Sequence, residues 1–178
     1  MKFHSLRIKR HPIAAAVAAA LALGGGLVAS NGYAQSTTAN MAVTASITNA
    51  CSIATTTLAF GPYVSGPNNA LTDGTATVTT VCTIDAVTTV MLSEGVNPTG
   101  TSTPAAPQRQ MANGTNRLAY FLYQNTARDQ VWGDTSLTGV GGVGTGGQVV
   151  LTVYGRIPVG QNKPAGSYAD TVVATVTF

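Results

Sequence analysis

Threonine constrains the fold of this chain most strongly, because all 27 threonines lie after residue 34. A threonine branches at Cβ, so it is restricted in a helix and suits a pleated strand. Valine is also common there, whereas leucine, glutamate, lysine and arginine are scarce. No apolar pattern with a period of 3.6 residues follows Ala34. The sequence therefore predicts an essentially all-β protein.

The first 34 residues differ in composition and match the layout of a secretory signal peptide. Four basic residues come early, an apolar stretch covers residues 13–23, and small residues end the segment at Ala34. The apolar stretch is short for a bilayer span, which needs about 20 residues. We expect residues 1–34 to be a signal peptide and the rest of the chain to be exported.

The charge that remains after residue 34 excludes several function classes. Five basic residues stand against six acidic ones, a net charge of −1, and both histidines lie within the first 11 residues. Scattered cations provide no basic patch for nucleic acid or for a membrane surface. Without histidine, an ordinary Ser-His-Asp triad cannot be assembled. We therefore expect no enzyme activity, no cofactor and no metal site.

The cysteines are Cys51 and Cys82, and an exported chain with an even number of cysteines most often pairs them. Two isolated cysteines cannot complete a zinc site, and no histidine is present to activate a thiolate. We expect a structural disulfide between Cys51 and Cys82.

Strand signals alternate with turn signals along the exported chain. A long loop with three prolines is expected at residues 97–116, and the Gly-rich residues 139–144 are expected to form a second loop. The expected strands cover residues 41–48, 75–83, 86–92, 118–123, 148–156 and 168–178. Such a chain suits a sandwich of about six strands, one fewer than a basic immunoglobulin-type sandwich.

Two of these strands have one apolar face each. In residues 41–48 that face holds Met41, Val43, Ala45 and Ile47. In the last strand it holds Val172, Ala174, Val176 and Phe178. A sandwich that lacks its last strand would expose a core groove and an unpaired edge, which must be covered.

Several segments resemble the spore coat protein U domain family, which includes the subunits of archaic chaperone-usher pili. The resemblance spans nearly the whole exported chain, and its most specific part is Gly-Ser-Tyr-x-Asp-Thr near the end. The matching segments are Leu-Ala-Tyr-Phe-Leu-Tyr at 118–123, Trp-Gly-Asp at 132–134, Val-Tyr-Gly-Arg-Ile-Pro at 153–158, Pro-Ala-Gly-Ser-Tyr-Ala-Asp-Thr-Val at 164–172 and Val-Thr-Phe at 176–178.

For such pilins the resemblance implies an incomplete immunoglobulin-like Greek-key sandwich, with an N-terminal donor strand. Residues 35–48 would be the donor extension, with Met41, Val43, Ala45 and Ile47 as the inserted face, and residues 49–178 the pilin domain. The edge strand with Val172, Ala174, Val176 and Phe178 would border the groove. The implied partners are a periplasmic chaperone, an outer-membrane usher and neighbouring subunits of a homopolymer at the cell surface.

Other interpretations remain open on the residues alone. Residues 41–48 could instead be the first strand of their own domain. The chain could be an adhesive, carbohydrate-binding tip module that uses Trp132 and the loop at 97–116, or a self-complemented coat protein.

Gly139 to Gly144 fit G-x-G-x-x-G, but a strand-like segment follows where dinucleotide binding needs a helix. Asp129 and Asp134 beside Trp132 are expected to be solvated turn acids around a buried ring.

Overall fold

The computed structural model describes residues 34–66 and 70–178. The predicted signal peptide, apart from Ala34, lies outside the described residues. The chain divides into two units, Met1–Thr44 and Ala45–Phe178. Residues 34–44 of the first unit contain neither helix nor strand, and the strands named below all belong to the second. Within the described residues, we find no helix with the length and hydropathy of a membrane span.

Five antiparallel strands form the larger sheet, in the order β1-β2-β7-β5-β4. Its longest pairing joins β2 to β7, with Thr72 opposite Ile157 and Val81 opposite Gln148. The strands are β1 (Cys51–Thr55), β2 (Thr72–Cys82), β4 (Arg109–Asn113), β5 (Asn116–Tyr123) and β7 (Gln148–Ile157).

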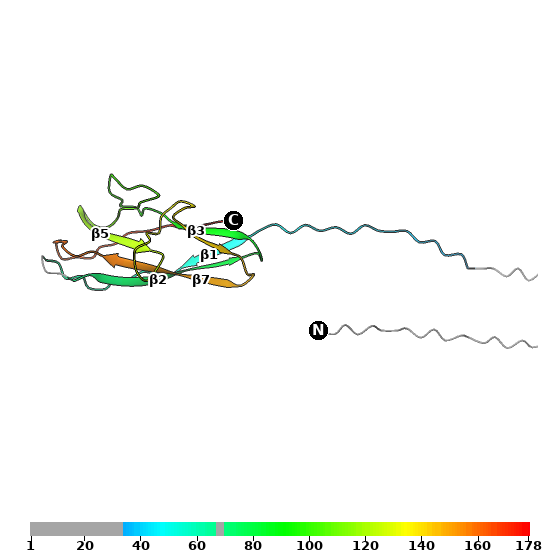
Figure 1. The fold of residues 1–178 in the computed structure, drawn as a ribbon, viewed down its shortest axis with the longest axis horizontal. Helices are drawn as coiled ribbons and strands as arrows, with labels where there is room; N and C mark the ends of the chain where they lie inside the picture. The colour runs from blue at the N-terminus through cyan, green and yellow to red at the C-terminus, as the bar shows by residue number, and fades with distance from the viewer. Residues whose placement is uncertain (1–33, 67–69) are drawn as a thin grey trace, which may run out of the picture. The chain divides into compact units, whose positions relative to one another are not determined.

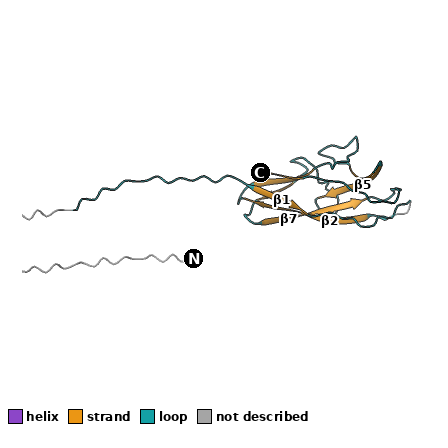
Figure 2. Cartoon of the chain, turned by 180° about the vertical axis from the view of Figure 1, so that it is seen from behind, coloured by secondary structure: helices purple, strands orange, loops and turns teal. Residues whose placement is uncertain are grey.

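Three antiparallel strands form the smaller sheet, in the order β6-β3-β8. They are β3 (Val87–Leu92), β6 (Val140–Val143) and β8 (Ala174–Thr177). The predicted all-β fold with two sheets is confirmed, and Figures 1 and 2 show the strands from opposite sides.

The hydrophobic core lies between the sheets and draws one side chain from every second position of their strands. In β2 the buried positions are Ala76, Val78, Thr80 and Cys82, while the residues between them are more exposed. This is the period of two that a half-buried strand requires. The smaller sheet supplies Val90 and Leu92, and the rest of the core is Leu118, Tyr120, Leu122, Trp132, Val153 and Ile157.

Two large polar side chains are buried together next to this core. The Trp132 indole N–H donates a 2.9 Å hydrogen bond to the Val90 carbonyl oxygen. The buried Arg109 guanidinium donates to the carbonyl oxygens of Leu92 (2.7 Å), Ser93 (2.8 Å) and Trp132 (2.9 Å). Because these carbonyl groups lie at the end of β3, directly after it, or in the loop after β5, Arg109 joins the larger sheet to the end of the smaller one.

The observed strands differ from the expected ones at five places, and one of them is β1, which lies where no strand was expected. Strand β4 lies inside the predicted loop at 97–116, and β6 lies inside the predicted Gly-rich loop. The last strand is only β8, so residues 168–173 of the expected strand lie outside it, and residues 41–48 form no strand. Gly144, directly after β6, permits close approach, since a Cβ there would collide with the Thr83 carbonyl oxygen.

Candidate functional site

An open groove runs between the two sheets, along the side where the described residues form no strand that joins their edges. Its central part is a cavity of about 480 Å³. One rim is formed by residues 55–60, which continue from β1, and the other by residues 168–174, which lead into β8. Strands β1 and β8 contact each other at one end, so the groove is closed there.

The floor of the groove is the hydrophobic core itself. Val78 and Leu92 are buried almost completely, and both line the cavity. Ala76, Tyr120, Leu122 and Val153 complete this floor. Apart from Asp170, the described residues that line the central part are uncharged. A surface of this kind favours a segment with apolar side chains over a charged ligand.

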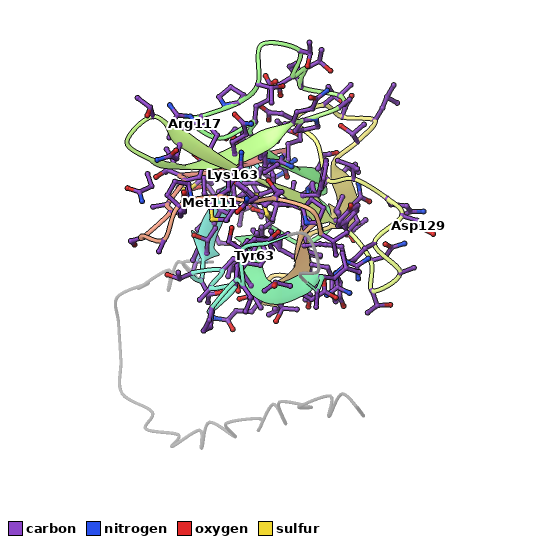
Figure 3. All side chains as sticks on the ribbon, turned by 90° about the vertical axis from the view of Figure 1, so that its left-hand side faces the viewer. Tyr63, Met111, Arg117, Asp129 and Lys163 are labelled. Carbon is purple, nitrogen blue, oxygen red and sulfur yellow. A yellow bond between two sulfur atoms is a disulfide. The ribbon has the colours of Figure 1, made fainter. Side chains whose placement is uncertain are left out.

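The groove continues into a second cavity of about 530 Å³ towards the opposite end of the domain. The two cavities share four lining residues, Leu58, Phe60, Met111 and Tyr168. Figure 3 looks onto this end, where Tyr63, Met111 and Lys163 are labelled and line the second cavity. The Tyr63 hydroxyl donates to the Pro158 carbonyl oxygen over 3.2 Å, and the Lys163 amide donates to the Ser65 hydroxyl over 2.6 Å. These bonds hold together the two segments at this far end.

Asp170 fixes the rim at residues 168–174. Its carboxylate accepts hydrogen bonds from the Tyr120 hydroxyl (2.7 Å), the Val96 amide (3.1 Å) and the Asn97 side-chain amide (3.1 Å). The Ala169 and Ala112 backbones bond to each other, and the Ser93 amide donates to the Val173 carbonyl oxygen. Residues 168–173 of the rim are therefore held in place without being part of a strand.

Burial shifts the acid–base equilibria beside the groove. It raises the pKa of the Tyr120 phenol far above its usual value, and the hydrogen bond to Asp170 adds to the rise. Burial also lowers the pKa of the Arg109 guanidinium to about 10. Neither shift is combined with a nucleophile or a metal-ligand set, since the described residues contain no group of three or more potential metal ligands.

The predicted groove-edge residues lie at different depths. Val172 and Ala174 line the central cavity, and Val176 packs against the core from β8. Phe178 is about half exposed beyond the end of β8. Val173 and Thr175 point outwards, as the alternation predicts. β8 is an edge strand, because β3 is its partner within the sheet.

The predicted donor face is exposed in this chain. The exposed fractions of Met41, Val43 and Ile47 are 86%, 86% and 89%, and Ala45 is exposed too. Because residues 41–48 form no strand, they are not the first strand of their own sheet. That alternative from the sequence was wrong, whereas the role of these residues as a donor stays a prediction.

Three further sequence interpretations have clear outcomes. Cys51 and Cys82 form the predicted disulfide, and they are directly opposite each other in β1 and β2. Trp132 is completely buried, so it cannot stack on a sugar as the tip-module alternative requires. Asp129 is exposed and Asp134 is intermediate, as turn residues around a buried ring.

Sequence reasoning missed one rim of the groove and the role of Asp170. Leu58 and Phe60 were not assigned to any element, because Gly61 and Pro62 follow them as turn signals. Asp170 belongs to the segment Gly-Ser-Tyr-x-Asp-Thr, and this segment is the sequence signal that points to it. In the structure the motif builds the rim: Gly166 packs closely on the Asn113 side chain, and the Tyr168 hydroxyl donates to Pro164.

Comparison with known proteins identifies the family. The model of the Spore Coat Protein U domain matches residues 37–175, so the chain belongs to the spore coat protein U domain family. Protein U of Myxococcus xanthus is 41% identical to it over 176 residues, which cover 93% of this chain and 98% of that protein.

A solved structure has a similar fold. It is the crystal structure of the CsuC–CsuE chaperone–tip adhesion subunit pre-assembly complex from the archaic chaperone-usher Csu pili of Acinetobacter baumannii. The TM-score is 0.53 at 21% identity, and the match covers 74% of this chain and 40% of that chain. With the two-sheet architecture, this similarity confirms the predicted immunoglobulin-like sandwich.

Proposed function

We propose that this protein is a non-enzymatic structural subunit of a surface pilus, and that it polymerises by strand donation. Residues 35–48 of one copy fill the groove of the next, with Met41, Val43, Ala45 and Ile47 against the core. The observation that carries the proposal is the open groove, whose floor is the hydrophobic core and whose rims are 55–60 and 168–174. Covering such a floor is favourable by about 25 cal/mol for each Å² of apolar surface removed from water.

The length of the groove suits this donor. The rim at residues 55–60 covers five residue steps, or roughly 17 Å if extended, and the second cavity continues the groove to Ser65. The donor face from Met41 to Ile47 covers six steps, or roughly 20 Å. Its four side chains alternate, so all four point to one side of an extended strand. Backbone hydrogen bonds to the rims supply affinity, and the alternating side chains supply specificity.

Donation to a second copy fits better than self-complementation. A hairpin with residues 48–50 as its turn would place residue 47 opposite Cys51 and residue 41 opposite Thr57. The donor would then lie mainly beside β1, where β8 already contacts it. Leu58 and Phe60 would remain uncovered, together with the second cavity. A neighbouring copy has no such constraint on its register.

The open groove and the edge strand also bear on how the protein is exported. An open apolar groove and an edge strand are aggregation hazards before the donor arrives. A periplasmic chaperone that covers them and an outer-membrane usher that exchanges them for a donor would solve this problem. The similarity of the fold to a chain from a chaperone–subunit complex supports this route.

Substitution at the donor face tests the proposal. Val43→Asp would bury an unpaired charge in the neighbour's groove, which costs several kcal/mol. Ala42→Asp is the matched control, because residue 42 points away from the groove. We expect surface-sheared material from the parent and from Ala42→Asp to form a ladder of oligomers on unheated SDS gels and a monomer after heating. Val43→Asp should give no ladder. Normal assembly of Val43→Asp contradicts the donor assignment, and a parent protein that stays monomeric supports a self-complemented coat protein.

A further inference from the structure

Exposed aliphatic side chains gather at the end of the domain where the extension begins. The exposed fractions of Ile84, Val87 and Val143 are 64%, 76% and 55%. Val87 and Val143 are directly opposite each other in β3 and β6, so they share one face of the smaller sheet. Ile84 lies in the turn between β2 and β3, and the next residue, Asp85, donates to the Gly144 carbonyl oxygen. We name Ile84, Val87 and Val143 the exit pole.

The exit pole lies beside the first residues of the domain. The Thr83 amide donates a 2.9 Å hydrogen bond to the Ala50 carbonyl oxygen, and the Ala50 amide donates to the Thr83 hydroxyl over 3.0 Å. Ala50 immediately precedes β1, and the disulfide ties the same place to the end of β2. The chain before residue 50 therefore leaves the domain next to Ile84.

Two more exposed valines lie at the opposite end of the domain. The exposed fractions of Val64 and Val159 are 75% and 52%. Their segments are joined by hydrogen bonds, from the Tyr63 hydroxyl to Pro158 and from the Lys163 amide to the Ser65 hydroxyl. We name Val64 and Val159 the far pole. The poles are separated by the length of β2, whose 11 residues span roughly 33 Å.

A short spacer fixes how near the donor's domain must lie to the groove that it fills. Only residues 48–50 separate Ile47 from Cys51, and four residue steps reach at most about 14 Å. The donor's exit pole must therefore lie close to the end of the groove that receives Ile47. If this were the closed end at β1 and β8, the donor's domain would occupy the place where the recipient's own extension leaves. The far end has no such conflict.

From these constraints, and resting on the proposed strand donation, we infer that the exit pole of one copy packs against the far pole of the next. The partner is thus a second copy of this chain, and the contact comprises Ile84, Val87 and Val143 on one side and Val64 and Val159 on the other. Exposed strand positions elsewhere carry single residues such as Thr175, Thr177 and Val150, whereas each pole groups exposed aliphatic side chains. Contact between the poles removes this apolar surface from water.

Site-specific photo-cross-linking of assembled fibres tests the contact. A p-benzoylphenylalanine side chain is placed at Val87, which is exposed enough to accept it, and a second sample carries it at the exposed Leu137 as a control. After irradiation and heating in SDS, we expect covalent dimers from position 87 and none from position 137. Mass spectrometry should join position 87 to the segments that contain Val64 or Val159. Because the poles of one copy are far apart, such a link must come from two copies.

Each outcome separates this inference from the proposed function. Replacing Val64 and Val159 together by Asp should abolish the cross-linked dimer while the ladder on unheated gels remains. A normal ladder with no cross-link, or with links to another surface, overturns the pole contact and leaves strand donation intact. If the parent protein forms no ladder, strand donation fails and the pole contact fails with it.

Discussion

The Tyr120 hydroxyl donates a 2.7 Å hydrogen bond to the Asp170 carboxylate, and this bond joins the core strand β5 to the rim of the groove. Tyr120 is buried, and its ring also meets Phe60 from the other rim edge-on, with 6.0 Å between the ring centroids. One side chain thus contacts both rims. The width of the groove is therefore set from its floor.

Removal of the Asp170 carboxylate should loosen this rim. Asp170→Ala deletes the acceptor of three hydrogen bonds and leaves the Tyr120 hydroxyl buried without this partner. We expect the free energy of unfolding to fall by roughly 2 to 4 kcal/mol, since bonds to charged groups contribute about 1.5 to 3 kcal/mol each and are not additive. Urea denaturation measures the change. Asp129→Ala, at an exposed turn, should change the midpoint little, and an equal effect of both substitutions would contradict the role of Asp170.

Alkaline pH should destabilise the protein through Tyr120. Its pKa is raised in the folded state, so ionisation is favoured in the unfolded chain, where the pKa is near 10. The stabilising contribution is complete below pH 10 and is lost as the pH rises above it. Tyr120→Phe cannot ionise, so its unfolding free energy should decline less steeply between pH 9 and pH 11. Arg109, with its pKa lowered to about 10, changes the slope in the opposite direction in both proteins. Parallel curves for the two proteins would refute the prediction.

The disulfide should account for a large part of the net stability. Cys51 and Cys82 are 31 positions apart, and closing such a loop stabilises a fold by about 3 to 4 kcal/mol in the chain-entropy model. The double substitution Cys51→Ser and Cys82→Ser should lower the unfolding free energy by that amount. Thiol labelling of the denatured, unreduced parent should detect no free thiol. Full labelling would show that the bond does not form on export.

The strands that the sequence predicts well are those with one buried face. β2, β3, β5 and β7 lie within three residues of the expected ranges at each end, because apolar side chains alternate with polar ones along them. β4 was missed because its inward position is occupied by Arg109, which reverses the expected pattern. β6 was missed because Gly141 and Gly142 are typical of loops, and only the pairing with β3 in the folded domain makes this segment a strand.

The candidate site was predictable at one rim and hidden at the other. The alternation in the last 11 residues indicates a groove edge at Val172 and Ala174. Asp170 acts through Tyr120, Val96 and Asn97, which lie 50 to 74 positions away in the sequence. Such a set cannot be found from local pattern, because its members share only their location in the fold.

The edge strand β8 provides the last prediction. Val176 lies opposite Val90 in β3 and packs against the core, whereas Thr175 is exposed on the other face. Val176→Asp should therefore detach β8 and expose the edge of β3, and the subunit should be degraded or insoluble in the periplasm instead of being recovered with its chaperone. Thr175→Asp is the matched control and should be recovered normally. Deletion of residues 176–178 should reproduce the loss seen with Val176→Asp. A truncated protein that accumulates as a soluble monomer without any chaperone would show that the domain needs neither β8 nor a partner to cover its edge.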